Sequence, residues 1–149
     1  MKYQEISNGY IVRFEQGEEV LSALSSFVTS FNVPSCTIQA IGSVQNPRLA
    51  YYNLTEKAFE EREFFGDFEL ISCLGSIGFE SDSPLIHLHA SISNKAFEIF
   101  GGHVKSMTAL ATVELVLSTL DTRLSKSYNN TVGLKLFDLE CEFPTSNNS

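Results

Sequence analysis

The sequence predicts an α+β domain in which a mostly antiparallel sheet carries one main amphipathic helix. Two observations favour this class: strand-like alternation recurs along most of the chain after residue 35, and only residues 18–32 show a clear helical period. At 149 residues the chain has the length of a single domain. We expect that domain to span residues 1–144 and a polar tail to follow at 145–149.

The helix is predicted from apolar side chains that recur along one face with a period of about 3.6 residues. Glu18 and Glu19 favour its positive N-terminal end, and Pro34 prevents its continuation. The residues on the apolar face are Val20, Leu21, Leu24, Phe27, Val28 and Phe31.

The remaining segments have the alternation and the β-branched content of strands. Asn46-Pro47 and Gly101-Gly102 are expected to interrupt them. Residues 109–120 suit a helix or a strand by composition, and their Thr and Val residues favour a strand. The predicted strands are 10–14, 37–44, 48–53, 58–65, 68–79, 85–93, 97–100, 110–120 and 134–139.

The charge balance argues against proteins that coat nucleic acid through bulk positive charge. Lys plus Arg number 10 and Asp plus Glu number 18, which gives a formal net charge of −8. The sequence has neither an apolar run of membrane-spanning length nor a signal-peptide core, so we expect a cytoplasmic protein without membrane contact. Charged residues make up 19%, below the usual share of about 25%, which favours buried contacts between subunits.

The three cysteines, Cys36, Cys73 and Cys141, are widely spaced and each has apolar neighbours. Their odd number and their spacing favour buried free thiols over disulfides or a thiolate metal site.

All three histidines fall between positions 87 and 103. His87 and His89 share one face of a predicted strand, because side chains two residues apart project the same way. A turn at Asn94-Lys95 and a return strand at 96–100 would bring His103 beside them. Three imidazoles in this arrangement can bind a divalent metal and leave a fourth coordination position open. A hydrogen-bonded polar patch is the alternative.

Glu69 and Glu114 lie in apolar runs, and either could orient a histidine ligand or lie on a solvated strand face. We expect Glu98, on the return strand, to be solvated. The cupin pattern fails because Ser93 and Asn94 stand where a cupin has its glutamate, four or five residues after the His-x-His pair. The sequence contains no His-Glu-x-x-His, phosphate-binding loop, Gly-x-Ser-x-Gly or Cys-x-x-Cys motif.

The chain resembles the PPC domain, the "plants and prokaryotes conserved" family that also forms the core of plant AT-hook nuclear-localised proteins. The matching segments are, in order, GYIVRFEQGEEVLSAL, CTIQAIGSV, FELISCLGSIGF, PLIHLHASIS and FGGHV, and TVELVL and GLKLF follow the same pattern. The resemblance implies an α+β fold, a homotrimer and a metal, usually zinc, bound at positions that match His87, His89 and His103. It also implies the family's DNA-binding label, although the Arg-Gly-Arg-Pro hook of the plant proteins is absent from this sequence.

Two hypotheses of different classes follow. One is a small trimeric metal-site protein, an enzyme or a sensor, with an open position for water or a small-molecule ligand. The other is a DNA-associated regulatory or assembly module in which the histidines are structural. The sequence names neither a reaction nor a substrate.

Overall fold

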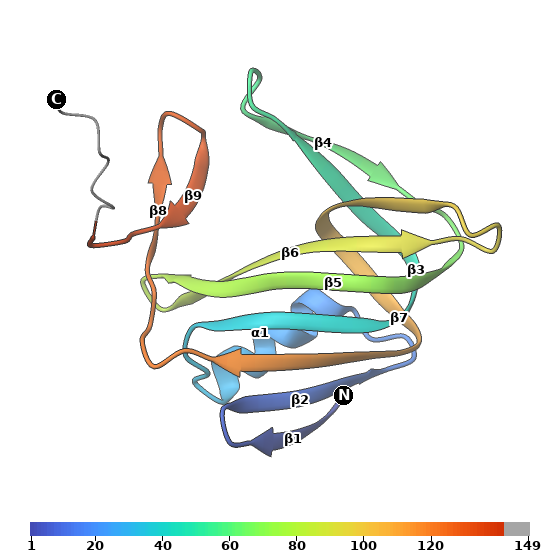
Figure 1. Cartoon of the computed structure of the whole chain (residues 1–149), viewed down its shortest axis with the longest axis horizontal. Coiled ribbons are helices and arrows are strands. Elements are labelled where there is room, and N and C mark those ends of the chain that lie inside the picture. The colour runs from blue at the N-terminus through green and yellow to red at the C-terminus, as the bar shows by residue number, and fades with distance from the viewer. Residues whose placement is uncertain (142–149) are drawn as a thin grey trace, which may run out of the picture.

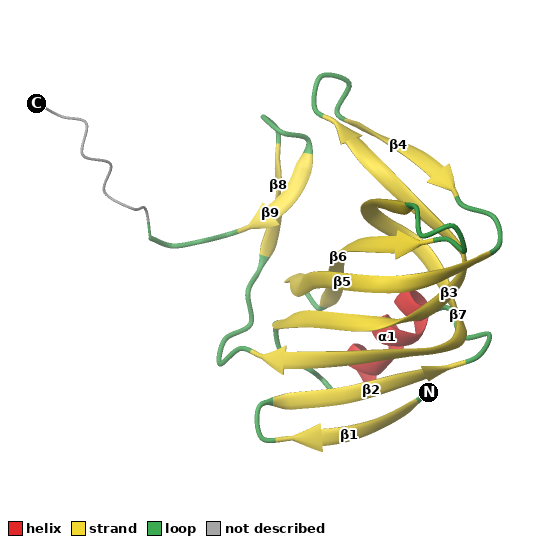
Figure 2. Ribbon diagram, turned by 45° about the vertical axis from the view of Figure 1, so that its right-hand side comes forward, coloured by secondary structure: helices red, strands yellow, loops and turns green. Residues whose placement is uncertain are grey.

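The computed structural model describes residues 1–141, so the tail expected at 145–149 lies outside the described residues. Seven strands form one sheet, one helix lies on a face of that sheet, and two further strands form a separate hairpin (Figure 1 and Figure 2). Every pairing between these named strands is antiparallel, which agrees with the mostly antiparallel sheet predicted. The elements are β1 (Lys2–Ile6), β2 (Gly9–Glu15), α1 (Val20–Ser30), β3 (Cys36–Asn53), β4 (Ala58–Glu63), β5 (Asp67–Glu80), β6 (Ser83–Ser93), β7 (Ile99–Thr119), β8 (Lys126–Asn129) and β9 (Leu134–Phe137).

Helix α1 confirms the predicted amphipathic pattern, except that Phe31 follows its last residue and is exposed. Glu19 caps it, since its carboxylate accepts hydrogen bonds from the backbone N–H groups of Leu21 and Ser22. Its buried residues, Val20, Leu24, Phe27 and Val28, pack on the inner face of the sheet. Burying each such side chain contributes about 1.5–3 kcal/mol of transfer free energy, which holds the helix on the sheet.

Strands β3 and β7 are long and bent, and their pairing closes part of the sheet on itself. The strand order is β1-β2-β7-β6-β5-β3-β4, with an additional pairing between β7 and β3. Neighbours β3, β5, β6 and β7 therefore form a closed hydrogen-bonded circuit. This closure brings the start of β7 between β6 and the second half of β3.

The break expected at Asn46-Pro47 is wrong, because β3 runs without interruption from Cys36 to Asn53. The pairing with β7 instead shifts register between Gln45 and Arg48, and Asn46 has a φ of 47°. Proline has no N–H to donate to a sheet, and it is tolerated inside a strand at such a bulge. The bulge bends the strand and does not end it.

The break expected at Gly101-Gly102 is also wrong, since both glycines lie inside β7. A Cβ atom on Gly102 would lie 2.8 Å from the Ala50 carbonyl oxygen, and one on Gly101 would lie 3.0 Å from that of Ala90. The glycines therefore allow close approach of strands on both sides.

The return strand begins at Ile99, later than the expected 96–100, because Asn94 holds the turn. Its side-chain oxygen accepts hydrogen bonds from the backbone N–H groups of Ala96 and Glu98. Strands β1 and β8 were not predicted, whereas the strand expected at 109–120 is part of β7.

The outer face of the sheet, opposite α1, carries no covering helix in the described chain (Figure 2). Exposed apolar side chains lie on it, including Ile11, Ile41 and Leu74. No helix within residues 1–141 is long and apolar enough to cross a membrane.

Cys36 and Cys73 are buried free thiols, as predicted. Cys141 is free but exposed, which corrects the expectation of a buried thiol. It follows the last strand, β9, and lies outside the hydrophobic core.

Candidate metal centre and its cavity

Strand pairing places the three histidines side by side on the outer face. His87 and His89 are both on β6, where the alternating residues Leu88 and Ala90 point into the core. His89 is the register partner of His103 on β7. The hairpin geometry expected from the sequence therefore brings all three imidazoles together.

The three imidazoles can present nitrogen atoms to a common point. Their candidate ligand atoms all lie within 4.8 Å of one another, and Nε2 of His87 is 3.1 Å from Nε2 of His89. Two nitrogens bound tetrahedrally to one zinc at about 2.0–2.1 Å would be about 3.3 Å apart. The His87–His89 pair already has close to this spacing, and small side-chain rotations would bring His103 to the same ion. The donor set fits a divalent metal.

The surroundings of His87 and His103 favour the neutral form of their imidazoles. Burial, with the charges of Lys126 and His89, lowers the pKa of His87. Burial is also the main cause that lowers the pKa of His103 to about 4, with further contributions from the other two histidines and Lys105. A neutral imidazole is the form that binds metal, so protons compete weakly for these two ligands at neutral pH.

Strands β3 and β4 support His103 from the other side. Its ring stacks on Phe59 with a centroid distance of 4.8 Å, and the backbone of His103 pairs with Ala50. The Lys105 ammonium lies 4.5 Å from the centre of the same Phe59 ring. These contacts fix the plane of the His103 imidazole.

Glu61 is a carboxylate whose charge acts on His103, and the sequence did not single it out. Its charge opposes the lowering of the His103 pKa. The same carboxylate pairs with Arg48 at 3.4 Å and Lys105 at 3.2 Å. It belongs to β4, which reaches the site only through pairing with β3.

The structure does not bring Glu69 or Glu114 to the histidines. Glu69 is exposed and lies opposite Ser93, four residues beyond His89. Glu114 is exposed and lies opposite Arg13, far along β7 from His103. Glu98 is exposed, as expected, and accepts a hydrogen bond from the Asn94 side chain.

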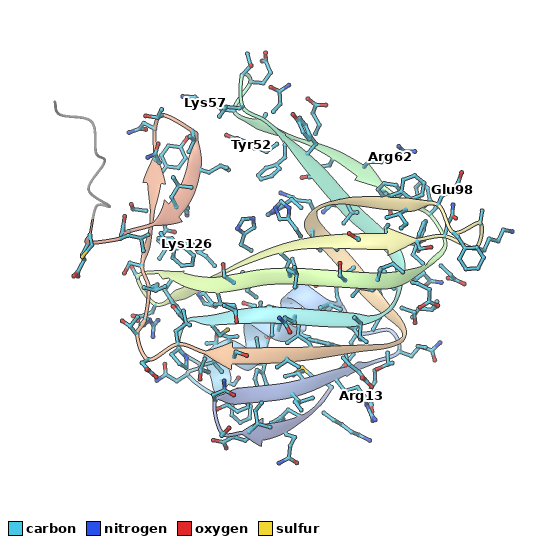
Figure 3. All side chains as sticks on the ribbon, viewed as in Figure 1. Arg13, Tyr52, Lys57, Arg62, Glu98 and Lys126 are labelled. Carbon is cyan, nitrogen blue, oxygen red and sulfur yellow. The ribbon has the colours of Figure 1, made fainter. Side chains whose placement is uncertain are left out.

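A cavity of about 830 Å³ opens in front of the histidines. Its walls come from β3, β4, β6, β7 and the β8–β9 hairpin, and most of its lining is apolar. The Tyr52 hydroxyl donates to the Val132 carbonyl at 2.6 Å, and Lys57 Nζ donates to the Asn130 carbonyl at 2.7 Å. Residues 48–63, the paired parts of β3 and β4 with their turn, form an arm (the β3–β4 arm). Figure 3 shows Tyr52 and Lys57 of this arm on the side toward the β8–β9 hairpin. These two bonds join the cavity walls.

Lys126, at the start of β8, is a further residue of this cavity that sequence reasoning missed. Figure 3 places it at the base of the β8–β9 hairpin, near β5 and β6. No local sequence pattern could have placed this lysine at the cavity, because its position depends on the way residues 120–137 fold back over β5.

Comparison with known proteins agrees with this architecture. The family model of the Plants and Prokaryotes Conserved (PCC) domain matches residues 1–121. The chain belongs to this family. It is the same family whose resemblance the sequence motifs indicated. The match ends at residue 121, before β8 and β9. No protein of curated function matches the chain in sequence.

Several solved structures share the PCC fold. A "putative DNA-binding protein" from Bacteroides thetaiotaomicron is 27% identical, with a TM-score of 0.90 over 94% of this chain and 98% of that one. A plant- and prokaryote-conserved protein from Pyrococcus horikoshii is 23% identical, with a TM-score of 0.84 over 95% and 97%. A metal-containing protein from Archaeoglobus fulgidus is 23% identical, with a TM-score of 0.82 over 93% and 100%.

Proposed function

We propose that this PCC-domain protein binds one divalent metal through His87, His89 and His103, and that the metal presents an open position to a small molecule in the cavity. The observation that carries the proposal is the convergence of three imidazole nitrogens within 4.8 Å at the wall of that cavity. The metal-containing description of the Archaeoglobus fulgidus protein supports it. Imidazole ligands favour zinc among the common divalent ions.

Three histidine ligands on zinc leave a fourth position for water or a ligand. A metal in such a site polarises a bound oxygen or lowers the pKa of bound water, which suits a metal-dependent enzyme or a small-molecule sensor. Within the described residues, the carboxylate whose charge reaches His103 is Glu61, and it is paired with Arg48 and Lys105. No reaction is assigned.

The decisive experiment is metal analysis of protein purified without chelator, beside its His89→Ala variant. We expect about one equivalent of zinc in the wild type and loss of most of it in the variant, because one of three ligands is removed. Cys141→Ser is the control, since Cys141 is exposed and lies outside the hydrophobic core. This control should keep its metal.

Wild-type protein that contains no stoichiometric metal, and gains none on titration with zinc, manganese, nickel or cobalt, would refute the site. The histidines would then form a hydrogen-bonded patch, with His87 and His89 in contact through Nε2.

We further propose a cytoplasmic homotrimer whose subunits cover the outer face. Its support is the exposure of Ile11, Ile41, Ile71 and Leu74 on the sheet and the low charged share of 19%. The free, buried thiols of Cys36 and Cys73 suit a reducing compartment.

A DNA-associated module is the second candidate function. It is favoured by the name of the Bacteroides thetaiotaomicron relative and by the same name given to a Ralstonia eutropha protein that shares the fold. The net charge of −8 opposes it, because non-specific DNA affinity comes from Lys and Arg that neutralise phosphates.

A further inference from the structure

Lys126 is buried at the cavity wall, between Gly78 and the ring of Phe137. The residue is only 7% exposed. Its stem lies against Gly78, where an added Cβ would be 2.9 Å from Lys126 Cε and 3.1 Å from Cγ. Its ammonium lies 4.5 Å from the centre of the Phe137 ring. A glycine on one side and an aromatic ring on the other therefore leave room for this lysine.

Among residues 1–141 no carboxylate forms an ion pair with the Lys126 ammonium. Since no fully buried side-chain nitrogen or oxygen of these residues lacks a hydrogen-bond partner, its Nζ is not sealed off from the cavity. The other lysine that lines the cavity, Lys135, donates to Glu80 at 2.6 Å. Burial lowers the pKa of Lys126, which reflects the cost of holding an unpaired charge there. An anion in the cavity would relieve that cost.

The charges around the cavity also favour an anion. The Lys126 charge acts on His87, so the ammonium and the histidine site share one electrostatic environment. Imidazole side chains carry no negative charge, and a divalent ion bound to them would make the cavity strongly positive in a chain of net charge −8. The lining is otherwise mostly apolar, with Tyr52, Phe59, Leu85 and Phe137 among its members.

We propose that Lys126 binds the carboxylate of a small carboxylic acid whose apolar body fills the cavity beside the three histidines. The proposal rests on the proposed function for the metal, but the lysine site itself is present without it. A carboxylate suits one ammonium donor, whereas a phosphate carries more charge and more acceptors and is usually bound by several donors. No arginine lines the described cavity to supply them.

The test is calorimetric titration with sodium hexanoate, performed on zinc-loaded and on chelator-treated protein. Lys126→Met removes the charge and keeps the stem, and Lys126→Gln is a second variant that keeps a polar end. Lys135→Met is the matched control, because Lys135 lines the same cavity but is paired with Glu80. Hexan-1-ol and inorganic phosphate test the requirement for a carboxylate.

We expect wild-type protein to bind hexanoate more tightly than hexan-1-ol or phosphate, and both Lys126 variants to bind it at least about tenfold more weakly. This is the loss expected for one charge-assisted hydrogen bond in a buried site. Lys135→Met should stay within about twofold of wild type, because its removal leaves the Lys126 ammonium in place.

The inference is overturned if hexanoate does not bind wild-type protein in either form, if hexan-1-ol or phosphate binds as tightly, or if both Lys126 variants keep wild-type affinity. Zinc content measured on the same samples separates the two proposals. Lys126-dependent hexanoate binding without any zinc binding would refute the metal site alone. Zinc binding without Lys126-dependent hexanoate binding would refute the lysine site alone.

Discussion

Thiol reactivity distinguishes the three cysteines at the level of single residues. Burial raises the pKa values of Cys36 and Cys73 to about 12, so both stay protonated in mildly alkaline buffer, whereas Cys141 is exposed. Because the thiolate is the nucleophile, we expect one thiol per chain to react rapidly with Ellman's reagent in the folded protein. All three should react in guanidinium chloride.

The control for this prediction is Cys141→Ser, which should abolish the rapid reaction. Rapid reaction of more than one thiol in folded wild-type protein would contradict the burial of Cys36 and Cys73.

The site residues that could be predicted from the sequence are the three histidines, because one strand and one hairpin relate their positions. His87 and His89 follow from the two-residue period of a strand, and His103 follows from a single hairpin. Glu61 and Lys126 arrive from β4 and β8, and no local period relates these strands to the histidines. Apolar runs identified Glu69 and Glu114 as candidates, but strand pairing leaves both exposed and away from the site.

At the level of elements, two hydrogen bonds couple the β8–β9 hairpin to the β3–β4 arm, and the Tyr52 bond can be removed without loss of a charge. Tyr52→Phe removes the hydroxyl that donates to Val132 at 2.6 Å, which should lower the free energy of unfolding by about 1 kcal/mol. We also expect faster amide hydrogen exchange in β8, β9 and their turn, because the hairpin loses a tether. Mass spectrometry of the exchanged protein measures both strands.

Tyr51→Phe is the matched control for the tether, since the adjacent Tyr51 is 72% exposed. It should change neither stability nor exchange. Equal exchange of β8 and β9 in wild-type protein and Tyr52→Phe would refute the coupling of the two hairpins.

Glycines set the close approach of the strands that carry the histidines. A Cβ at Gly75 would lie 2.0 Å from the His87 carbonyl oxygen, while one at Gly101 would lie 3.0 Å from that of Ala90. Gly75→Ala should therefore lower the thermal midpoint more than Gly101→Ala. Overpacking at Gly75 should lower the free energy of unfolding by about 1–3 kcal/mol or more. Thermal unfolding followed by circular dichroism tests the order, and a Gly101→Ala variant less stable than Gly75→Ala would contradict it.

Strand positions were predictable from the sequence where alternation is strong, but strand ends were not. Proline and paired glycines usually mark the end of a strand, and here Pro47 lies at a bulge while Gly101 and Gly102 lie inside β7. Both features reflect contacts with neighbouring strands, which the local pattern does not contain. The uninterrupted lengths of β3 and β7 therefore emerge only from the closed circuit of pairings.

At the level of the whole molecule, the proposed trimer predicts a mass of three times 16.5 kDa in light scattering. Ile41→Glu places a charge on the outer face, where burial against another subunit would be costly, so we expect it to shift the mass toward a monomer. Leu54→Glu is the matched control, because Leu54 and Ile41 are both 59% exposed but Leu54 lies in the turn after β3. A wild-type monomer, or a variant Ile41→Glu that remains a trimer, would contradict this prediction.

The charge of the whole molecule decides the DNA-associated alternative. Arg13, Arg48, Lys105, Arg123 and Lys135 each pair with a carboxylate of this chain, so their charges are already offset. Each phosphate that a protein neutralises adds about −0.9 to the slope of log affinity against log salt. A protein of net charge −8 in which these cations are paired should therefore show a shallow slope. We expect no salt-sensitive binding of an AT-rich duplex in fluorescence anisotropy at physiological salt. A dissociation constant below micromolar with a steep salt slope would overturn this expectation. The same DNA affinity in His89→Ala would show that DNA binding is independent of the metal site.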